Sequence, residues 1–211
     1  MAQATRNVSL GLGDGRFPEG LHLCHIFNDD DERAKTLARF IERGLREGER
    51  ALCLVDAMTA DEVHRHLGEA GVDVAAVGAR FAVACAEPTY CLGGSFVPDV
   101  CLAAFGQFVE QSKAEGCTGA RIMGDMSWAV RRGTTTEALL EYEAKVKEYV
   151  ERFPVTAVCE YDARMFDGAT VLDILAMHPA MIVRGQVVIN PYFEEPYAYL
   201  ARYRARHAHA V

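Results

Sequence analysis

The sequence lacks the segments that would insert a protein into a membrane or export it. None of its 211 residues belongs to an uninterrupted apolar run of about 18 residues, the length that a transmembrane helix needs. The first residues, Met1 to Gly20, are polar and rich in glycine, and they contain no apolar core of a signal peptide. We therefore expect a cytoplasmic protein without a membrane partner, in which residues 1–19 form a flexible leader.

Paired cysteines of the kind that bind metals are also missing. The chain has seven cysteines, an odd number, and no CxxC spacing. Most of them lie in apolar runs, which indicates buried, reduced thiols, and only Cys91 falls in an expected loop. We expect no metal and no cofactor. The run His22-Leu-Cys24-His25 leaves open whether these three side chains bind an ion, because one short cluster is a weak signal.

Positive charge is scarce. The sequence has 22 Lys and Arg residues against 30 Asp and Glu residues, which gives a formal net charge of −8. A protein that binds nucleic acid over a broad surface needs an excess of positive charge. The basic tail from Arg202 to His209 is too short to reverse the balance, so we expect no direct nucleic-acid partner.

A phosphate-binding loop is absent from the place where it would be expected. Residues 21–27 predict a strand, residues 32–46 a helix and residues 51–55 a second strand. A P-loop protein has G-x-x-x-x-G-K-[ST] after the first strand, whereas this chain has Asn28-Asp-Asp-Asp-Glu-Arg33. That segment has no glycine, and its four carboxylates would repel a phosphate. They are better suited to cap the first helix, so binding or sensing is favoured over ATP hydrolysis.

The remaining elements continue the alternation of strands and helices. Further strands are expected at 80–85, 120–125 and 155–161, helices at 59–70, 98–115, 136–152 and 168–177, a hairpin at 180–190 and a helix after Pro196. Residues 86–97 are expected to form a loop. This order predicts an α/β fold, a mostly parallel doubly wound sheet with helices on both faces and a C-terminal β-hairpin. We expect one domain over 20–196 and a helical tail over 197–211, which can pack on its own domain or on a partner.

Several short motifs occur in the order and spacing of a known family. They are Gly20-Leu-His22-Leu-Cys24, Gly44-Leu-x-x-Gly-Glu49, Gly119-x-Arg121, Gly124-Asp-Met-Ser-Trp128, Tyr142-Glu143, Cys159-x-Tyr-Asp162, His178-Pro179 and Asn190-Pro-Tyr192. The chain resembles the MEDS domain, a sensory domain of the dichloromethane-responsive repressor and of methanogen and methylotroph signalling proteins. The resemblance implies a RecA-like or KaiC-like core without a working Walker A loop.

The resemblance also implies a function. Such domains are thought to sense small, hydrocarbon-derived compounds, and they are often fused to a DNA-binding or kinase module. The length of this chain leaves no room for such a module. We therefore expect it to act in signalling or transcriptional regulation through a protein partner such as a kinase or regulator. The sequence leaves open whether the protein forms a homo-oligomer.

Candidate ligand-binding residues lie on the strands or at their carboxyl ends, where doubly wound sheets bind ligands. The set combines aromatic, sulfur, imidazole and carboxylate groups, as a pocket for a small, partly apolar ligand would. It comprises His22, Cys24, His25, Phe27, Asp125, Met126, Trp128, Glu160, Tyr161 and Asp162. No catalytic residue is assigned, because no nucleophile elbow, Ser-His-Asp order or HExxH motif is present.

Each of these residues has a structural alternative. Asp125 stands where a Walker B aspartate would, and it would otherwise cap the next loop or helix. Trp128 would cover the pocket from the loop rim, near Phe27 and Tyr161, or would be a packing residue. Glu160 and Asp162 face the same side of their strand and would pair with arginines such as Arg121 and Arg164.

The histidines also have competing interpretations. His22 and Cys24 share one face of their strand and His25 takes the other. His22 would be a hydrogen-bonded core histidine, a pocket residue or a metal ligand. His178, which precedes Pro179, is expected to cap a helix end. The alternative function is that of an enzyme, either a degenerate ATPase or a metal-dependent hydrolase that uses His22, Asp125 and Glu160. A third possible function is that of a scaffold that binds a protein partner and no ligand.

Overall fold

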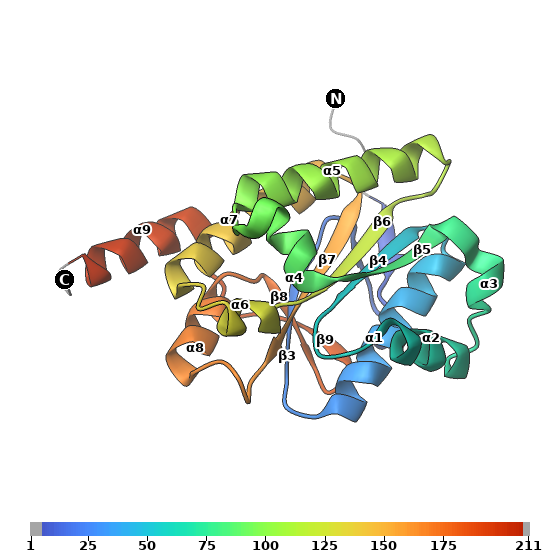
Figure 1. Ribbon diagram of the computed structural model, residues 1–211, viewed down its shortest axis with the longest axis horizontal. Helices are drawn as coiled ribbons and strands as arrows, with labels where there is room; N and C mark the ends of the chain where they lie inside the picture. The colour runs from blue at the N-terminus through green and yellow to red at the C-terminus, as the bar shows by residue number, and fades with distance from the viewer. Residues whose placement is uncertain (1–5, 209–211) are drawn as a thin grey trace.

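The fold is built on one twisted sheet, shown in Figure 1. The structure is a computed structural model that describes residues 6–208. Its seven-stranded sheet has the order β5-β4-β6-β7-β3-β8-β9, and every neighbouring pair is parallel except β8 and β9. The strands are β3 (His22–Phe27), β4 (Arg50–Val55), β5 (Phe81–Cys85), β6 (Ala120–Asp125), β7 (Val155–Asp162), β8 (Ala180–Val183) and β9 (Gln186–Ile189). The predicted parallel sheet and terminal hairpin are confirmed.

Helices cover both faces of the sheet, as predicted (Figure 1). One face carries α1 (Asp30–Arg46), α2 (Ala60–Glu69) and the short α3 (Val74–Val77), and the other carries α5 (Pro98–Ala114) and α7 (Thr136–Arg152). Two further helices follow β7, namely α8 (Gly168–Ala176) and α9 (Pro196–His207). We call the two sides of the sheet the α1 face and the α7 face. The alternating side chains of each strand supply both cores.

The helix starts follow from local hydrogen bonding. Asp29 caps α1 by accepting a bond from the Glu32 amide, and three acidic residues occupy the first turn, so the predicted role of this acidic run is confirmed. Thr59 and Glu62 form a capping box at the start of α2. These caps hold the segment after β3 as an ordinary helix N-terminus.

Residues 6–19 of the expected flexible leader contain regular structure. Two short strands, β1 (Asn7–Ser9) and β2 (Arg16–Pro18), pair as an antiparallel hairpin. Val8, Leu10 and Leu12 are buried in the core of the α1 face, which explains why the segment is ordered despite its glycines. Residues 1–5 lie outside the described part of the chain.

Two expected loops contain short helices. The interval 86–97, expected as a loop, holds α4 (Ala86–Tyr90) and the 3-10 turn η2 (Leu92–Gly94). The segment after β6 forms α6 (Ser127–Arg131) instead of an open loop. Such single turns are too short to show a helical period in sequence, and burial of Tyr90 and Trp128 fixes them.

The C-terminal helix packs on its own domain. Tyr199 and Leu200 of α9 join Leu140 and Ala144 of α7 in a third apolar cluster. The expected tail helix is confirmed up to His207, and residues 209–211 lie outside the described part. Among the residues described, no helix is both long and apolar enough to cross a membrane.

Candidate functional site

Arg33 dominates the carboxyl end of the sheet on the α1 face. Its guanidinium donates to Asp125 Oδ2 at 2.6 Å and, through two nitrogens, to Glu160 Oε2 at 3.1 Å. His25 Nδ1 lies 3.1 Å from the other oxygen of Glu160. All four side chains are buried. We call this group the Arg33 cluster (Arg33, His25, Asp125, Glu160).

The Arg33 cluster is an ionic network in which both carboxylates are paired with the guanidinium. Burial alone would lower the pKa of Arg33, but Glu160 and Asp125 outweigh it and raise the pKa, so the guanidinium stays charged. Asp125 also accepts bonds from the amides of Ala57 and Ser127. The capping role considered for Asp125 is therefore confirmed. Arg33 fills the space between the two carboxylates where a cation would otherwise be required.

The neighbouring residues at this edge are also paired. Asp162 accepts from the guanidinium and the amide of Arg164, and this partner lowers the pKa of Asp162. Phe27 packs under Arg33, whose guanidinium carbon lies 4.8 Å from the ring centroid. The expected pairing of Asp162 with Arg164 is confirmed. The suggested use of Arg121 is wrong, because Arg121 is buried beside Glu49 and donates to the backbone of Phe40 and Ser9.

The ten predicted site residues do not converge on one place. The α1 face receives His25, Phe27, Asp125, Glu160 and Asp162, and the α7 face receives His22, Cys24, Met126, Trp128 and Tyr161. The period of two along β3, β6 and β7 explains this division for the strand residues, whereas Met126 and Trp128 lie at and in α6. The predicted opposition of His22 and Cys24 to His25 is confirmed. Whether any of the ten binds a ligand stays a prediction.

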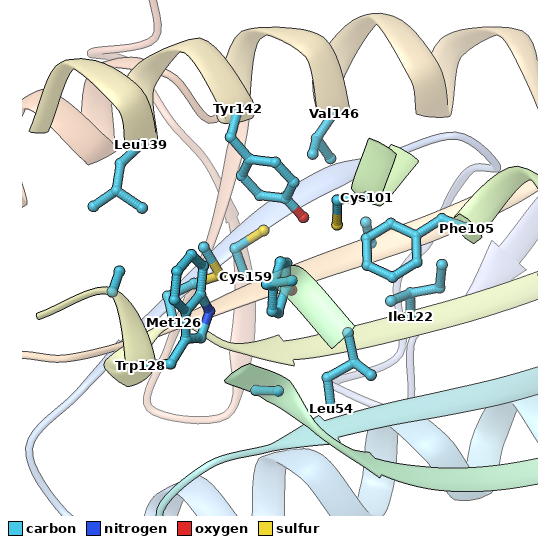
Figure 2. Close-up of a cluster of buried hydrophobic side chains, with 14 of the residues drawn as sticks. Leu54, Cys101, Phe105, Ile122, Met126, Trp128, Leu139, Tyr142, Val146 and Cys159 are labelled. Atoms are coloured by element: carbon cyan, nitrogen blue, oxygen red, sulfur yellow. The ribbon is translucent and has the colours of Figure 1, made fainter. Parts of the chain in front are cut away.

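Trp128 lies within the core and not on a rim. Its side chain is 0% exposed and stacks on Tyr90, with ring centroids 5.1 Å apart, while Phe96 packs edge-on at 4.9 Å. Figure 2 shows Trp128 beside Met126, below the side chains that α7 sends toward the sheet. The rim position expected for Trp128 is wrong. Phe27 cannot approach it, because Phe27 lies on the α1 face.

A small apolar cavity lies in this core between the sheet and helices α5 and α7. It measures about 20 Å³. Its walls include Tyr90, Phe105, Ile122, Tyr142 and Cys159, several of which are labelled in Figure 2. A space of this size admits about one water-sized group. The aromatic walls and the Cys159 sulfur favour an apolar, polarisable occupant over a charged one.

A second group of ionisable side chains is buried on the α7 face, and we call it the buried tetrad (His22, Glu143, Cys159, His178). One ligand atom of each residue lies within 4.8 Å of those of the other three. Glu143 Oε2 is 3.0 Å from His22 Nε2 and 3.2 Å from His178 Nε2, and Cys159 Sγ is 3.5 Å from His22 Nε2. These are the residue types that bind transition metals.

Burial sets the protonation of the buried tetrad. Burial and the neighbouring His178 ring lower the pKa of His22 to about 4, so its imidazole is neutral near pH 7. Burial and the nearby Glu143 carboxylate raise the pKa of the Cys159 thiol well above its usual value. His178 Nδ1 donates to the Ile174 carbonyl at 2.8 Å, which confirms its expected capping role and turns Nε2 toward Glu143. Tyr161 donates its hydroxyl to Glu143 Oε1.

Sequence reasoning missed Arg33 and Glu143 as the centres of the two groups. Both carried a signal. Arg33 is a cation directly after the acidic first turn of α1, near the helix end where the dipole disfavours positive charge. Glu143 interrupts the apolar stripe of α7 between Leu140 and Val146. A charged residue needs a partner of opposite charge in the fold when it stands at a position where an apolar residue or the other sign of charge is expected.

The chain is similar to known proteins over most of its length. Residues 21–179 match the family described as MEDS, the methanogen/methylotroph, DcmR sensory domain. A relative, the transcriptional repressor DcmR of Methylorubrum extorquens, is 36% identical over 59 residues, which make up 28% of this chain and only 22% of the repressor. A KaiC-like protein from Pyrococcus horikoshii has the same fold, with a TM-score of 0.58 at 19% identity over 85% of this chain and 81% of that one.

Proposed function

The chain belongs to the MEDS family, and from this membership we propose that it senses a small apolar molecule, a hydrocarbon derivative, in the cavity of the α7 face. The occupied state is read by a protein partner in signalling or transcriptional regulation, and no ATP is hydrolysed. The family is described as a sensory domain, which supports a sensory and regulatory role. The chemical class of the ligand and the use of a protein partner go beyond the family description and are proposed for this chain.

The observation that carries the proposal is the cavity beside Cys159. An apolar ligand binds where it replaces no polar contact and gains dispersion contacts with aromatic walls. The volume of about 20 Å³ favours a compound of very few heavy atoms. A larger compound would have to displace side chains, and such a displacement is a change that a partner could detect.

The Arg33 cluster argues against the ATPase-like alternative. An ATPase needs Asp125 free to hold a magnesium ion and a glycine-rich loop to hold phosphates. Here Arg33 pairs with Asp125 and Glu160, and Asp29 caps α1 through its own side chain. We therefore expect that isothermal titration of the protein with Mg-ATP gives no heat above background. Binding of Mg-ATP with micromolar affinity would contradict this part of the proposal.

The cavity is tested with Gly124→Ala. A Cβ atom at Gly124 would lie 2.1 Å from the hydroxyl oxygen of Tyr90, so the Tyr90 ring has to move within the cavity wall. Gly68→Ala on α2 is the matched control, because a Cβ atom there meets nothing within 4 Å. Chlorinated methanes, short alkanes and methanol are titrated while the emission of Trp128, the only tryptophan, is recorded.

Trp128 stacks on Tyr90, so a ligand that moves Tyr90 changes the environment of the indole. We expect at least one compound to change the emission and raise the melting temperature of the unmodified protein and of Gly68→Ala. The same compound should act at least tenfold more weakly on Gly124→Ala. If the two variants respond equally, the ligand does not use this cavity.

A further inference from the structure

Two of the four inner atoms of the buried tetrad have no hydrogen-bond partner, whereas His22 Nε2 and Cys159 Sγ contact each other at 3.5 Å. Glu143 Oε2 is close to His22 Nε2 and to His178 Nε2, at 3.0 and 3.2 Å, but neither contact has the geometry of a hydrogen bond. Glu143 Oε2 and His178 Nε2 have no hydrogen-bond partner among the described residues, although both side chains are 0% exposed. Buried polar atoms are satisfied in nearly all native proteins, so these atoms call for a partner.

The separations fit a metal ion at the centre of the buried tetrad. Ligand atoms about 2.0–2.3 Å from a tetrahedral zinc ion lie roughly 3.3–3.7 Å from one another. Three of the six separations, 3.0, 3.2 and 3.5 Å, are close to these edges, and the other three are no longer than 4.8 Å.

The surrounding hydrogen bonds orient the ligand atoms. The bond from His178 Nδ1 to the Ile174 carbonyl, at 2.8 Å, fixes the proton on Nδ1 and leaves the Nε2 lone pair directed inward. Tyr161 donates to Glu143 Oε1 and so leaves Oε2 as the inward oxygen. Partners of this kind support metal ligands in known sites.

Charge balance also favours a divalent ion. Two neutral imidazoles, one carboxylate and one thiolate carry two negative charges, which a divalent cation cancels. The Cys159 thiol would release its proton to solvent when its sulfur binds the ion. A neutral assembly can be buried, whereas the Glu143 carboxylate alone could not be buried cheaply.

We propose that His22, Glu143, Cys159 and His178 form a buried, four-coordinate site for a divalent transition-metal ion of the zinc class. The site joins β3, α7, β7 and the end of α8, so the ion ties four separate elements together. Cys159 belongs both to this site and to the wall of the cavity. The proposal does not depend on what the cavity binds, and its test needs no organic ligand.

The test uses the full chain expressed in minimal medium with zinc or with cobalt as the added metal. Elemental analysis after extensive dialysis should find one metal ion per chain. The cobalt form should show the intense visible bands of a tetrahedral ion and a thiolate-to-cobalt charge-transfer band in the near ultraviolet. A metal content far below one per chain, with no such bands, would overturn the proposal without affecting the proposed ligand cavity.

Substitutions identify the ligands. Cys159→Ser should lose the charge-transfer band and at least tenfold in metal affinity, and Tyr161→Phe should keep the band but lose about 10–100-fold in affinity. Cys53→Ser is the matched control, since Cys53 is a buried strand cysteine on the α1 face. A band that survives in Cys159→Ser, or that disappears in Cys53→Ser, would assign the sulfur elsewhere. Should Cys159→Ser not fold, the stoichiometry and spectrum of the unmodified protein still decide the proposal.

A proton is the competing occupant. If His178 is charged, it balances Glu143 without any metal, and the buried tetrad is then a structural ion pair. This alternative predicts an unchanged ultraviolet and visible spectrum in cobalt medium, a result that contradicts the proposal.

Discussion

The two faces of the sheet use similar side chains in different ways. On the α1 face, Arg33 donates to both Asp125 and Glu160 at 2.6–3.1 Å, so both carboxylates have a cationic partner. On the α7 face, Glu143 and His178 lie at comparable distances but keep unpaired inward atoms. Both groups are buried and both join distant segments. The difference teaches that a dense group of ionisable residues is not in itself a site. An unpaired carboxylate oxygen distinguishes the buried tetrad from the Arg33 cluster, where both carboxylates are paired and the unpaired buried atom is His25 Nε2.

The largest effect is expected from breaking the Arg33 cluster. Arg33→Met removes the cation that pairs with two buried carboxylates and should reduce the free energy of unfolding by about 3–5 kcal/mol. Urea denaturation measures this change. Arg164→Met is the control, because Arg164 is exposed and its loss should matter much less. Adding Asp125→Asn and Glu160→Gln to Arg33→Met should recover part of the stability, and an absence of any recovery would mean that packing, not charge, explains the loss.

Zinc should stabilise the α7 face by a smaller amount. An ion that binds only the folded chain, present at 100 times its dissociation constant, adds about 2.7 kcal/mol to the free energy of unfolding. The melting temperature of the metal-free protein should therefore rise with zinc, and His178→Asn should abolish the rise. His25→Asn, in the Arg33 cluster, serves as the matched histidine control and should retain it. Equal responses of the two variants would contradict the assignment.

Acid should weaken the α1 face slightly. Arg164 lowers the pKa of Asp162 below the ordinary 3.8, so this pair contributes stability that is complete above that pH and disappears as the pH falls through the lowered value. As the pH falls below about 4, the unmodified protein should therefore progressively lose this contribution, while Arg164→Met has none to lose. Urea midpoints across that range measure the difference. Parallel curves for the two proteins would show that the pair is too exposed to matter.

The smallest effect concerns thiol reactivity, which tests burial on both faces. All seven cysteines are free, but only Cys85 is exposed and Cys117 is intermediate. Cys91, expected in an accessible loop, is buried at the end of α4, which corrects that expectation. A thiol reagent should label Cys85 quickly and Cys117 more slowly in the native protein, as peptide mass spectrometry can show. Rapid labelling of Cys159 would mean that the α7 face opens.

Much of the fold follows from local patterns. Alternation of strands and helices predicts the parallel sheet, and the apolar runs locate its strands to within one or two residues at each end. The short α4 and α6 and the N-terminal hairpin could not be predicted in this way. Their residues are held by burial against distant parts of the chain, as Val8 is, and not by a local period.

The sequence by itself determined which side chains share a face of a strand. A period of two places His22 and His25 on opposite sides, whatever the order of the strands. The sequence also predicted an acidic helix cap at the place where a phosphate-binding loop would stand. The hydrogen bond that Asp29 accepts at the start of α1 confirms this cap. Both results depend only on backbone geometry over a few residues.

Only the tertiary structure decided which of these side chains meet. His22 and Cys159 are 137 residues apart, and they become neighbours because β3 pairs with β7. Glu143 and His178 reach them only because α7 and the end of α8 pack over that pair. Strand order and helix rotation depend on the burial of the whole core, so the pattern of a single segment cannot specify them.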